Sequence, residues 1–164
     1  MFECEAQSLK VAVEMAIKAG ADIQSADLRY ANLHSANLRS ADLCNANLHS
    51  ANLSYADIRD ADLSYADLSS ADLISADLIS TDLRSANLNY ADLSSANIDY
   101  SSWPLWCGTK SVKVDVNIAA QLAAHFCALD CEDKNFLKAK KAILKFAKTS
   151  HRAKDLGLFD KGAK

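Results

Sequence analysis

Apolar and polar residues recur in blocks of five along the middle of the chain. From Ala21 to Tyr100 the sequence divides into 16 consecutive pentads without insertion, each reading Ala, Asp or Asn, Leu or Ile, and then two variable residues. The first position is Ala in 15 of the pentads, with Thr81 as the exception. A period of five fits neither an α-helix nor a plain strand. The pattern therefore predicts a backbone that turns a corner every fifth residue.

The positions within a pentad have different expected directions. The first and third residues are two apart, so in an extended segment their side chains point the same way. We expect this Ala and Leu pair to face inward and the Asp or Asn between them to face outward. Ser, Asn and Tyr dominate the fifth position, and Ser and Asn are common turn residues. The fourth and fifth positions are therefore predicted to form the corner.

This sequence pattern resembles the pentapeptide-repeat family over about half of the chain. The resemblance implies a mainly β fold, a right-handed quadrilateral β-helix with four pentads in each square coil. The Leu side chains would then stack in a continuous column, with Ala leaving room beside them. Coils about 4.8 Å apart would make a four-coil rod of roughly 19 Å.

A solenoid needs covers over its two ends. Residues 1–20 are predicted to form an N-terminal helical cap, since Leu9, Val13, Ala16 and Ile17 share one stripe of a helix over 5–19. The repeat region is 21–100, and 101–164 is a basic helical C-terminal module. The sequence predicts that Trp103 and Trp106 cover the last coil, or alternatively form a binding platform.

The C-terminal module has its own helical pattern. Val112, Val114 and Val116 alternate with polar residues as in a short strand. Helices are expected over about 117–130 and 134–149, the second capped by Asp133 or a neighbour. As C-terminal helices do in some members of the resembled family, this module is a candidate for homodimerisation. The candidate cap or dimer contacts are Trp103, Trp106, Leu122 and Phe126.

Charge separates these segments. Residues 21–100 contain 12 Asp and 4 Arg but no Glu or Lys, a net charge of -8, whereas residues 101–164 contain 12 Lys or Arg and 6 Asp or Glu, a net charge of +6. With four pentads in a coil, residues twenty apart stack. One outward face would then carry a full ladder of carboxylates, and another would carry two more. The predicted acidic ladder residues are Asp22, Asp42, Asp62 and Asp82, with Asp57 and Asp77 on the other face.

An ordered acidic wall favours a partner that normally binds a polyanion. Duplex DNA carries about one charge per 1.7 Å of axis, and eight net charges over the roughly 19 Å rod give a comparable density. Some pentapeptide-repeat proteins, including quinolone-resistance proteins, act as DNA mimics on type II topoisomerases. This chain differs from them in having only Leu or Ile at the central position, fewer coils and no loops between coils. Four coils match only about six base pairs, so mimicry of a longer duplex requires an end-to-end dimer.

The leading hypothesis is therefore a non-enzymatic interaction module. Its acidic rod would occupy the basic nucleic-acid cleft of a protein partner and inhibit a DNA-processing or defence complex. A competing reading is that the Asp and Asn residues only solvate the wall or bond to the local backbone. The chain would then be a scaffold that binds protein through its C-terminal helices or through an apolar patch of Tyr55, Ile74 and Ile79.

A third hypothesis is that the Lys residues of the second C-terminal helix bind nucleic acid or a small anion. They recur at helical spacing on one face, namely Lys134, Lys138, Lys141, Lys145 and Lys148. The plain interpretation is the solvated side of a helix. Since no aromatic residues alternate with them, direct binding of nucleic acid is disfavoured.

Other chemistry has little support in the sequence. No GxSxG, Walker, HExxH or GxGxxG motif occurs, so we expect no enzyme and no cofactor. His125, Cys127 and Cys131 lack the spacing of a zinc site, and core thiols are the expected alternative. The chain has no apolar run of about 18 residues and no signal-peptide pattern. We therefore expect a cytoplasmic protein without membrane contact.

Overall fold

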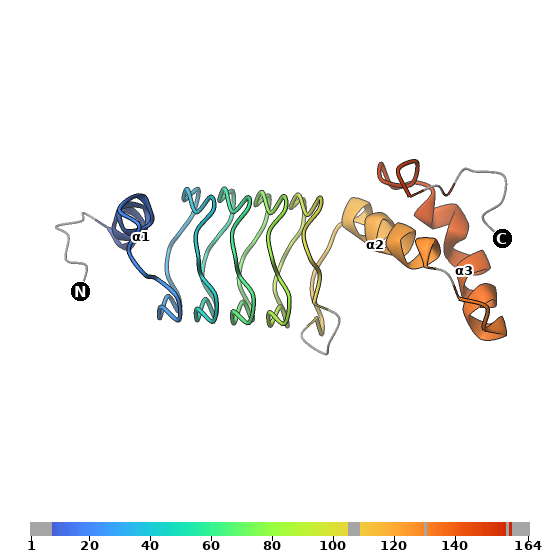
Figure 1. The fold of residues 1–164 in the computed structure, drawn as a ribbon, viewed down its shortest axis with the longest axis horizontal. Coiled ribbons are helices and arrows are strands. Elements are labelled where there is room, and N and C mark those ends of the chain that lie inside the picture. Colours follow the sequence, from blue (N-terminus) through green and yellow to red (C-terminus); the bar gives the residue numbers. More distant parts are fainter. Residues whose placement is uncertain (1–7, 105–108, 130, 157, 159–164) are drawn as a thin grey trace. The chain divides into compact units, whose positions relative to one another are not determined.

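The computed structural model describes residues 8–104, 109–129, 131–156 and 158. The helices within these residues are α1 (Leu9–Lys18), α2 (Val116–Ala128) and α3 (Lys134–Ala147), in that order. The chain divides into two compact units, Met1–Lys113 and Val114–Lys164. In Figure 1 the first unit contains helix α1 and the pentads, which wind into successive coils. The second unit contains helices α2 and α3.

The pentads form coils of four sides each, because parallel bridges join residues that are twenty apart. The bridges fall on the second residue of the pentads, and each is a single isolated pair. The described residues therefore contain no extended β-strand. Each side is too short for more, since a corner follows every bridge. The expected β structure is therefore present as single-residue ladders between coils.

Every backbone N–H of a central pentad has a partner. The first residue donates to the carbonyl three residues earlier, and the second donates to the coil before. The third and fifth residues donate to the coil after, and the fourth donates to a side chain. In the pentad 61–65 these distances are, in order, 3.3, 3.0, 2.9, 2.8 and 2.9 Å. Such complete pairing is what a buried backbone requires.

The interior is a column of Leu and Ile lined by Ala. All third-position side chains from Leu28 to Ile98 are at most 5% exposed. Thr81, the one departure from Ala, is fully buried, and its hydroxyl donates to the carbonyl oxygen of Ile58 at 2.8 Å. The predicted inward pair of the pentad is confirmed.

The corners are β-turns with a left-handed residue. The fifth residue of all sixteen pentads has a φ between 54° and 64°, and the next N–H closes the turn onto the third-position carbonyl. A positive φ at the third place of a turn is the feature of type II. Ser, Asn, Asp and Tyr occupy this position, and no β-branched residue does.

Helix α1 lies against the first coil. Ser8 caps it by accepting a bond from the N–H of Val11. Its Lys10 ammonium donates to the carbonyl oxygen of His34 at 3.0 Å, and Glu14 accepts from the N–H of Asn37 at 2.8 Å. Val13 and Ala16 are buried as the stripe predicts, whereas Leu9 is half exposed.

The chain continues to pair with the last coil after the repeat ends. Ser102 bridges Asp82, and Lys113 bridges Asp92. This single bridge at Lys113 takes the place of the short strand expected over 112–116. Val116 instead begins α2, because the Asp115 carboxylate accepts from the N–H groups of Asn117 and Ile118.

The second unit is a helical pair. Asp133 caps α3 as predicted, accepting from the N–H groups of Asn135 and Phe136. Helices α2 and α3 pack against each other with the following turn. The buried centre of this small core consists of Ala124, Cys127, Ala147, Ala153 and Leu158.

Candidate partner-binding surface

The second residue of each pentad holds the corner of the coil through its side chain. In all sixteen pentads its Oδ1 atom accepts a hydrogen bond from the backbone N–H of the fourth residue, at 2.8–3.3 Å. This arrangement is an Asx turn. Asp and Asn both carry Oδ1, so the turn accepts either residue. The choice of Asp over Asn therefore sets the charge of the wall.

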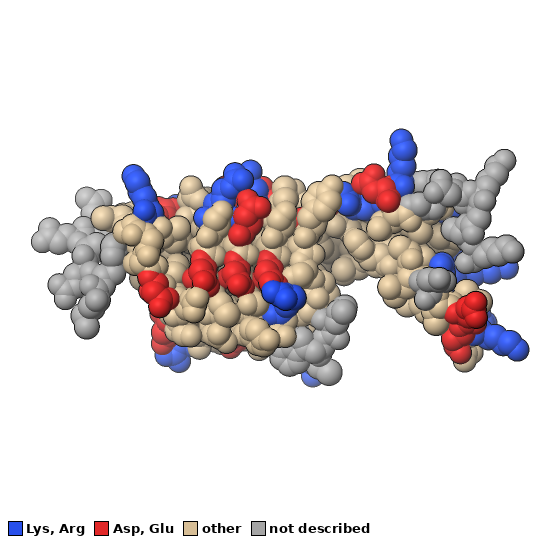
Figure 2. All heavy atoms as spheres, in the orientation of Figure 1, with Lys and Arg blue, Asp and Glu red and all other residues tan. Residues whose placement is uncertain are grey.

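Carboxylates twenty residues apart line up along one face. Parallel bridges place Asp42, Asp62 and Asp82 in one column. Asp22 has no such bridge among the described residues, but it lines the same hollow of about 340 Å³ as Asp42. In that hollow the Gln24 amide donates to Asp42 at 2.6 Å. We call Asp22, Asp42, Asp62 and Asp82 the acidic column, and Figure 2 shows a row of acidic side chains along the repeat.

The last member of the acidic column is paired. Arg84 donates to Asp82 through Nε at 2.8 Å and through Nη2. The Ser102 hydroxyl donates to the same carboxylate at 2.8 Å. These bonds, those from the Arg84 side chain first, hold the pKa of Asp82 well below its usual range. The carboxylate therefore stays ionised, but its charge is compensated.

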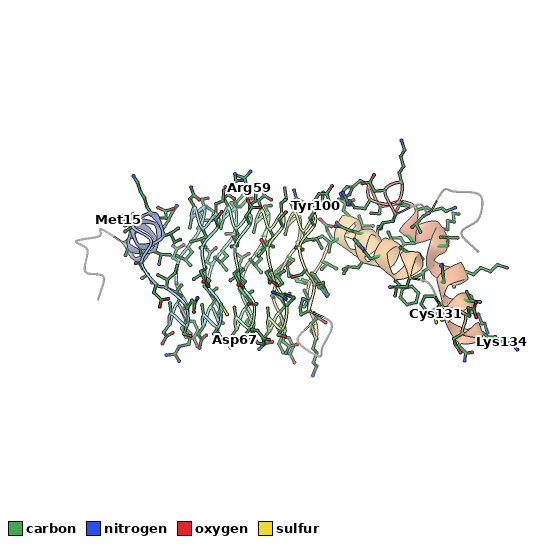
Figure 3. All side chains as sticks on the ribbon, in the orientation of Figure 1. Met15, Arg59, Asp67, Tyr100, Cys131 and Lys134 are labelled. Carbon is green, nitrogen blue, oxygen red and sulfur yellow. The ribbon has the colours of Figure 1, made fainter. Side chains whose placement is uncertain are left out.

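A second arginine compensates the other predicted acidic face. Arg59 bonds Asp57 through Nε at 2.7 Å and through Nη2, and its Nε lies 3.4 Å from Asp77. Hydrogen bonds from the Arg59 side chain lower the pKa of Asp57, and the same pairing raises the pKa of Arg59. In Figure 3, Arg59 and Asp67 lie on opposite sides of the coils. The Asp57 and Asp77 face is thus a mixed-charge network.

The uncompensated carboxylates gather around the third coil. Residues 61–80 contain Asp at all four second positions and no Lys or Arg. Of these, Asp62, Asp67 and Asp72 have no ion pair with a residue that the structure describes, while Asp77 contacts Arg59 of the preceding coil. Asp67 and Asp72 lie on faces other than that of the acidic column, so the pattern of ladders did not mark them as uncompensated. A count of charges coil by coil would have done so.

The predicted apolar patch has a different composition from the one expected. Tyr55 is 61% exposed, but Ile74 and Ile79 are only partly exposed. The two fourth-position isoleucines are thus more covered than the fifth-position Tyr55. The exposed large hydrophobic side chains among the described residues of the repeat are five tyrosines, all at the fifth position, namely Tyr30, Tyr55, Tyr65, Tyr90 and Tyr100.

Histidines lie beside two of these tyrosines. His34 meets the Tyr55 ring edge-on with centroids 5.5 Å apart, and His49 meets Tyr30 in the same way at 5.6 Å. The Nδ1 atom of His49 lies 2.8 Å from the hydroxyl of Ser69. Both histidines thus contact serine side chains of the next coil. Each histidine lies about one coil from its tyrosine in the sequence, and no motif in the sequence predicted these contacts.

The predicted cap and dimer residues have unequal support. Trp103 is partly exposed, whereas Trp106 lies outside the described residues. The Phe126 ring contacts the Phe136 ring at a tilt of 43°, with centroids 4.9 Å apart, and packs against the core of the second unit. Leu122 is partly exposed on α2.

The candidate metal ligands do not converge in the part of the chain that the structure describes, where no group of three or more His, Cys, Asp or Glu could hold a metal ion. Cys127 is buried, and burial raises the pKa of its thiol. His125 and Cys131 are exposed. Within the same residues, no helix is long and apolar enough to cross a membrane.

Coils of four sides, each formed by one pentad, define the class of protein as a repeat solenoid. Residues 26–64 and residues 61–99 each match the family model described as pentapeptide repeats (8 copies). Residues 26–99 of the chain are therefore pentapeptide repeats, as the pentads predict. The sequence matches no curated protein.

Similar solved structures include other pentapeptide repeat proteins. One from the cyanobacterium Cyanothece 51142 is 35% identical, with a TM-score of 0.48, over 56% of this chain and 58% of its own. One from the Arabidopsis thaliana thylakoid lumen is 25% identical, with a TM-score of 0.44, over 66% and 68%. QnrB1, a plasmid-mediated fluoroquinolone resistance protein, is 22% identical, with a TM-score of 0.28, over 62% and 63%. The chain thus spans under two thirds of the length of the cyanobacterial protein.

Proposed function

We propose that this chain is a non-enzymatic interaction module whose acidic column enters the basic nucleic-acid cleft of a partner protein. By occupying that cleft it would inhibit a DNA-processing or defence complex. The coils take the right-handed quadrilateral form of the family, with residues 1–20 as the N-terminal cap and 101–164 as the C-terminal module. The whole chain would act in the cytoplasm, as a monomer or as a homodimer.

One observation carries this proposal, the stacking of Asp42, Asp62 and Asp82 in bridged register. Like charges about 4.8 Å apart repel by about 1 kcal/mol in a water-like medium. The Asx turn works equally well with the uncharged Asn that other pentads carry. The repulsion is therefore not a requirement of the fold, and its retention supports a recognition role.

Because some of the predicted acidic residues form ion pairs within the chain, only the others would carry uncompensated charge toward a partner. Asp57, Asp77 and Asp82 are offset by Arg59 and Arg84. A basic cleft would gain most from the carboxylates without such a partner, Asp22, Asp42 and Asp62. In the third coil it would meet the acidic column at Asp62, and residues 61–80 include no Lys or Arg.

The test is displacement of proteins from DNA. A native lysate is bound to immobilised duplex DNA, and the purified chain is added at low and at raised salt. We expect release of specific proteins at low salt, and much weaker release by Asp42→Asn/Asp62→Asn. The matched control is Asp67→Asn/Asp72→Asn, which removes two charges from other faces and should keep most of the activity. Failure of the unmodified chain to displace any protein would contradict the proposal.

The tyrosines support a second candidate function, a scaffold that binds protein without mimicry. Their exposed fractions, 58–71%, are large for aromatic side chains, and tyrosine is enriched at interfaces. The contact would centre on Tyr55 and include the partly exposed Ile74 and Ile79. Binding of this kind would tolerate salt and would be lost in Tyr55→Asn. Asn accepts the left-handed corner, and Tyr90→Asn, on another corner, is the control.

A further inference from the structure

Helix α3 carries a basic face with no partner in the described structure. Lys134, Lys138, Lys141 and Lys145 are exposed and are spaced at i, i+4, i+7 and i+11. None of them is ion-paired to a described residue. We call these four residues the lysine row. Figure 3 shows Lys134 at the start of α3.

The charge that complements this row lies in the same chain. Residues 114–164 contain ten Lys or Arg and six Asp or Glu, whereas residues 21–100 carry a net charge of -8. The most regular negative feature of the repeat is the acidic column. Both surfaces are linear arrays of single charges.

The spacings of the two arrays agree. A helix rises about 1.5 Å per residue, so the lysine row has steps of about 6, 4.5 and 6 Å over roughly 16 Å. The carboxylates of the column repeat at about 4.8 Å and span roughly 14 Å. The difference of about 2 Å over the whole length is within the reach of flexible Lys side chains. An α3 helix laid parallel to the column would therefore meet carboxylates with successive ammonium groups.

We infer that the lysine row of one copy docks on the acidic column of a second copy. This contact is heterologous, since the two surfaces differ, so a pair of copies keeps one free lysine row and one free acidic column. Repetition builds rings or open chains. It differs from the C-terminal dimer considered above, in which two C-terminal modules would meet. It does not rest on the proposed function, because it needs no DNA-binding partner, although it would cover the same carboxylates.

The experiment is sedimentation velocity of the full chain over a concentration series, at about 20 mM and about 0.5 M salt, where screening differs strongly. We expect assembly beyond the 17.7 kDa monomer at low salt and its loss at high salt. Lys134→Gln/Lys138→Gln/Lys141→Gln/Lys145→Gln and Asp42→Asn/Asp62→Asn should each stay monomeric. Asp67→Asn/Asp72→Asn and the matching four-fold Lys→Arg variant should still assemble.

Mixing the two inactive variants gives the sharpest outcome. One retains only the lysine row and the other only the acidic column, so together they should form a one-to-one heterodimer that grows no further. A monomeric unmodified chain at low salt, including one that becomes more compact, would overturn the inference. So would assembly of the Gln variant alone, or loss of assembly in Asp67→Asn/Asp72→Asn. Circular dichroism of each variant confirms that it is folded.

Discussion

Arg84 lies two residues after Asp82 and donates hydrogen bonds to its carboxylate from both Nε and Nη2. Their side chains are 73% and 24% exposed, so solvent screens the pair. The pKa of Asp82 is lower in the folded state than the value of about 3.9 expected for an unfolded chain. The folded state therefore binds fewer protons at this site. The pair stabilises the protein fully above that unfolded value, and its contribution is lost as pH falls through the folded one.

The first prediction concerns this acid dependence. Asp82→Asn should weaken the fall in the free energy of unfolding below about pH 4. Urea titrations at several pH values measure the slope. Asp42→Asn, at a carboxylate without an ion pair among the described residues, is the control. An unchanged acid slope in Asp82→Asn would show that the Arg84 contact is not formed in solution.

The second prediction separates charge from geometry at the Asx turn. Asp62 accepts from the N–H of Ser64 at 2.8 Å, and Ser64 is buried. Asp62→Ala leaves that N–H unpaired and should cost about 1–3 kcal/mol of the free energy of unfolding. Asp62→Asn keeps the bond and relieves repulsion along the column, so its stability should equal or exceed that of the parent. Equal losses in both variants would show that the carboxylate charge, not the turn, stabilises the coil.

The sequence predicts the parts of this fold that depend on periodicity. The inward Leu column, the corner at the fifth residue and the coil of four pentads all follow from the repeat and the family it resembles. The stacking of Asp42, Asp62 and Asp82 follows from the same register. These features depend on backbone position alone.

Features that depend on side-chain direction could not be predicted in this way. Arg59 reaches two carboxylates, one of them in the next coil, only because its side chain runs along the wall. Ile74 is half-buried for the same reason. Lys113 lies outside the repeat, so no periodicity points to its 2.6 Å ion pair with Asp92. The sequence therefore predicted where the carboxylates lie better than which of them are compensated.

The third prediction concerns the core column. Leu63 is 1% exposed and lies in a central coil. Leu63→Ala should lower the free energy of unfolding by about 2–5 kcal/mol, because the rigid coils above and below cannot close the cavity. Leu63→Ile, which the third position accepts elsewhere, should cost less than about 1.5 kcal/mol. Thermal and urea unfolding measure both. Similar values for the two variants would contradict a tightly packed column.

The fourth prediction concerns the corner. Ser70 has a φ of 59°, in the left-handed region. A β-branched side chain is strained there, so Ser70→Val should cost about 1–2 kcal/mol of the free energy of unfolding. Glycine adopts this conformation without strain, although Ser70→Gly raises the entropy of the unfolded chain. We therefore expect a smaller loss of the free energy of unfolding in Ser70→Gly than in Ser70→Val. Ser69→Val, at the neighbouring fourth position where Ile is accepted in other pentads, adds the same side chain without a left-handed φ. It also removes the hydroxyl that lies 2.8 Å from Nδ1 of His49, so a smaller loss than in Ser70→Val isolates the effect of φ. If Ser69→Val were as destabilising as Ser70→Val, loss of the serine hydroxyl rather than backbone strain would explain both.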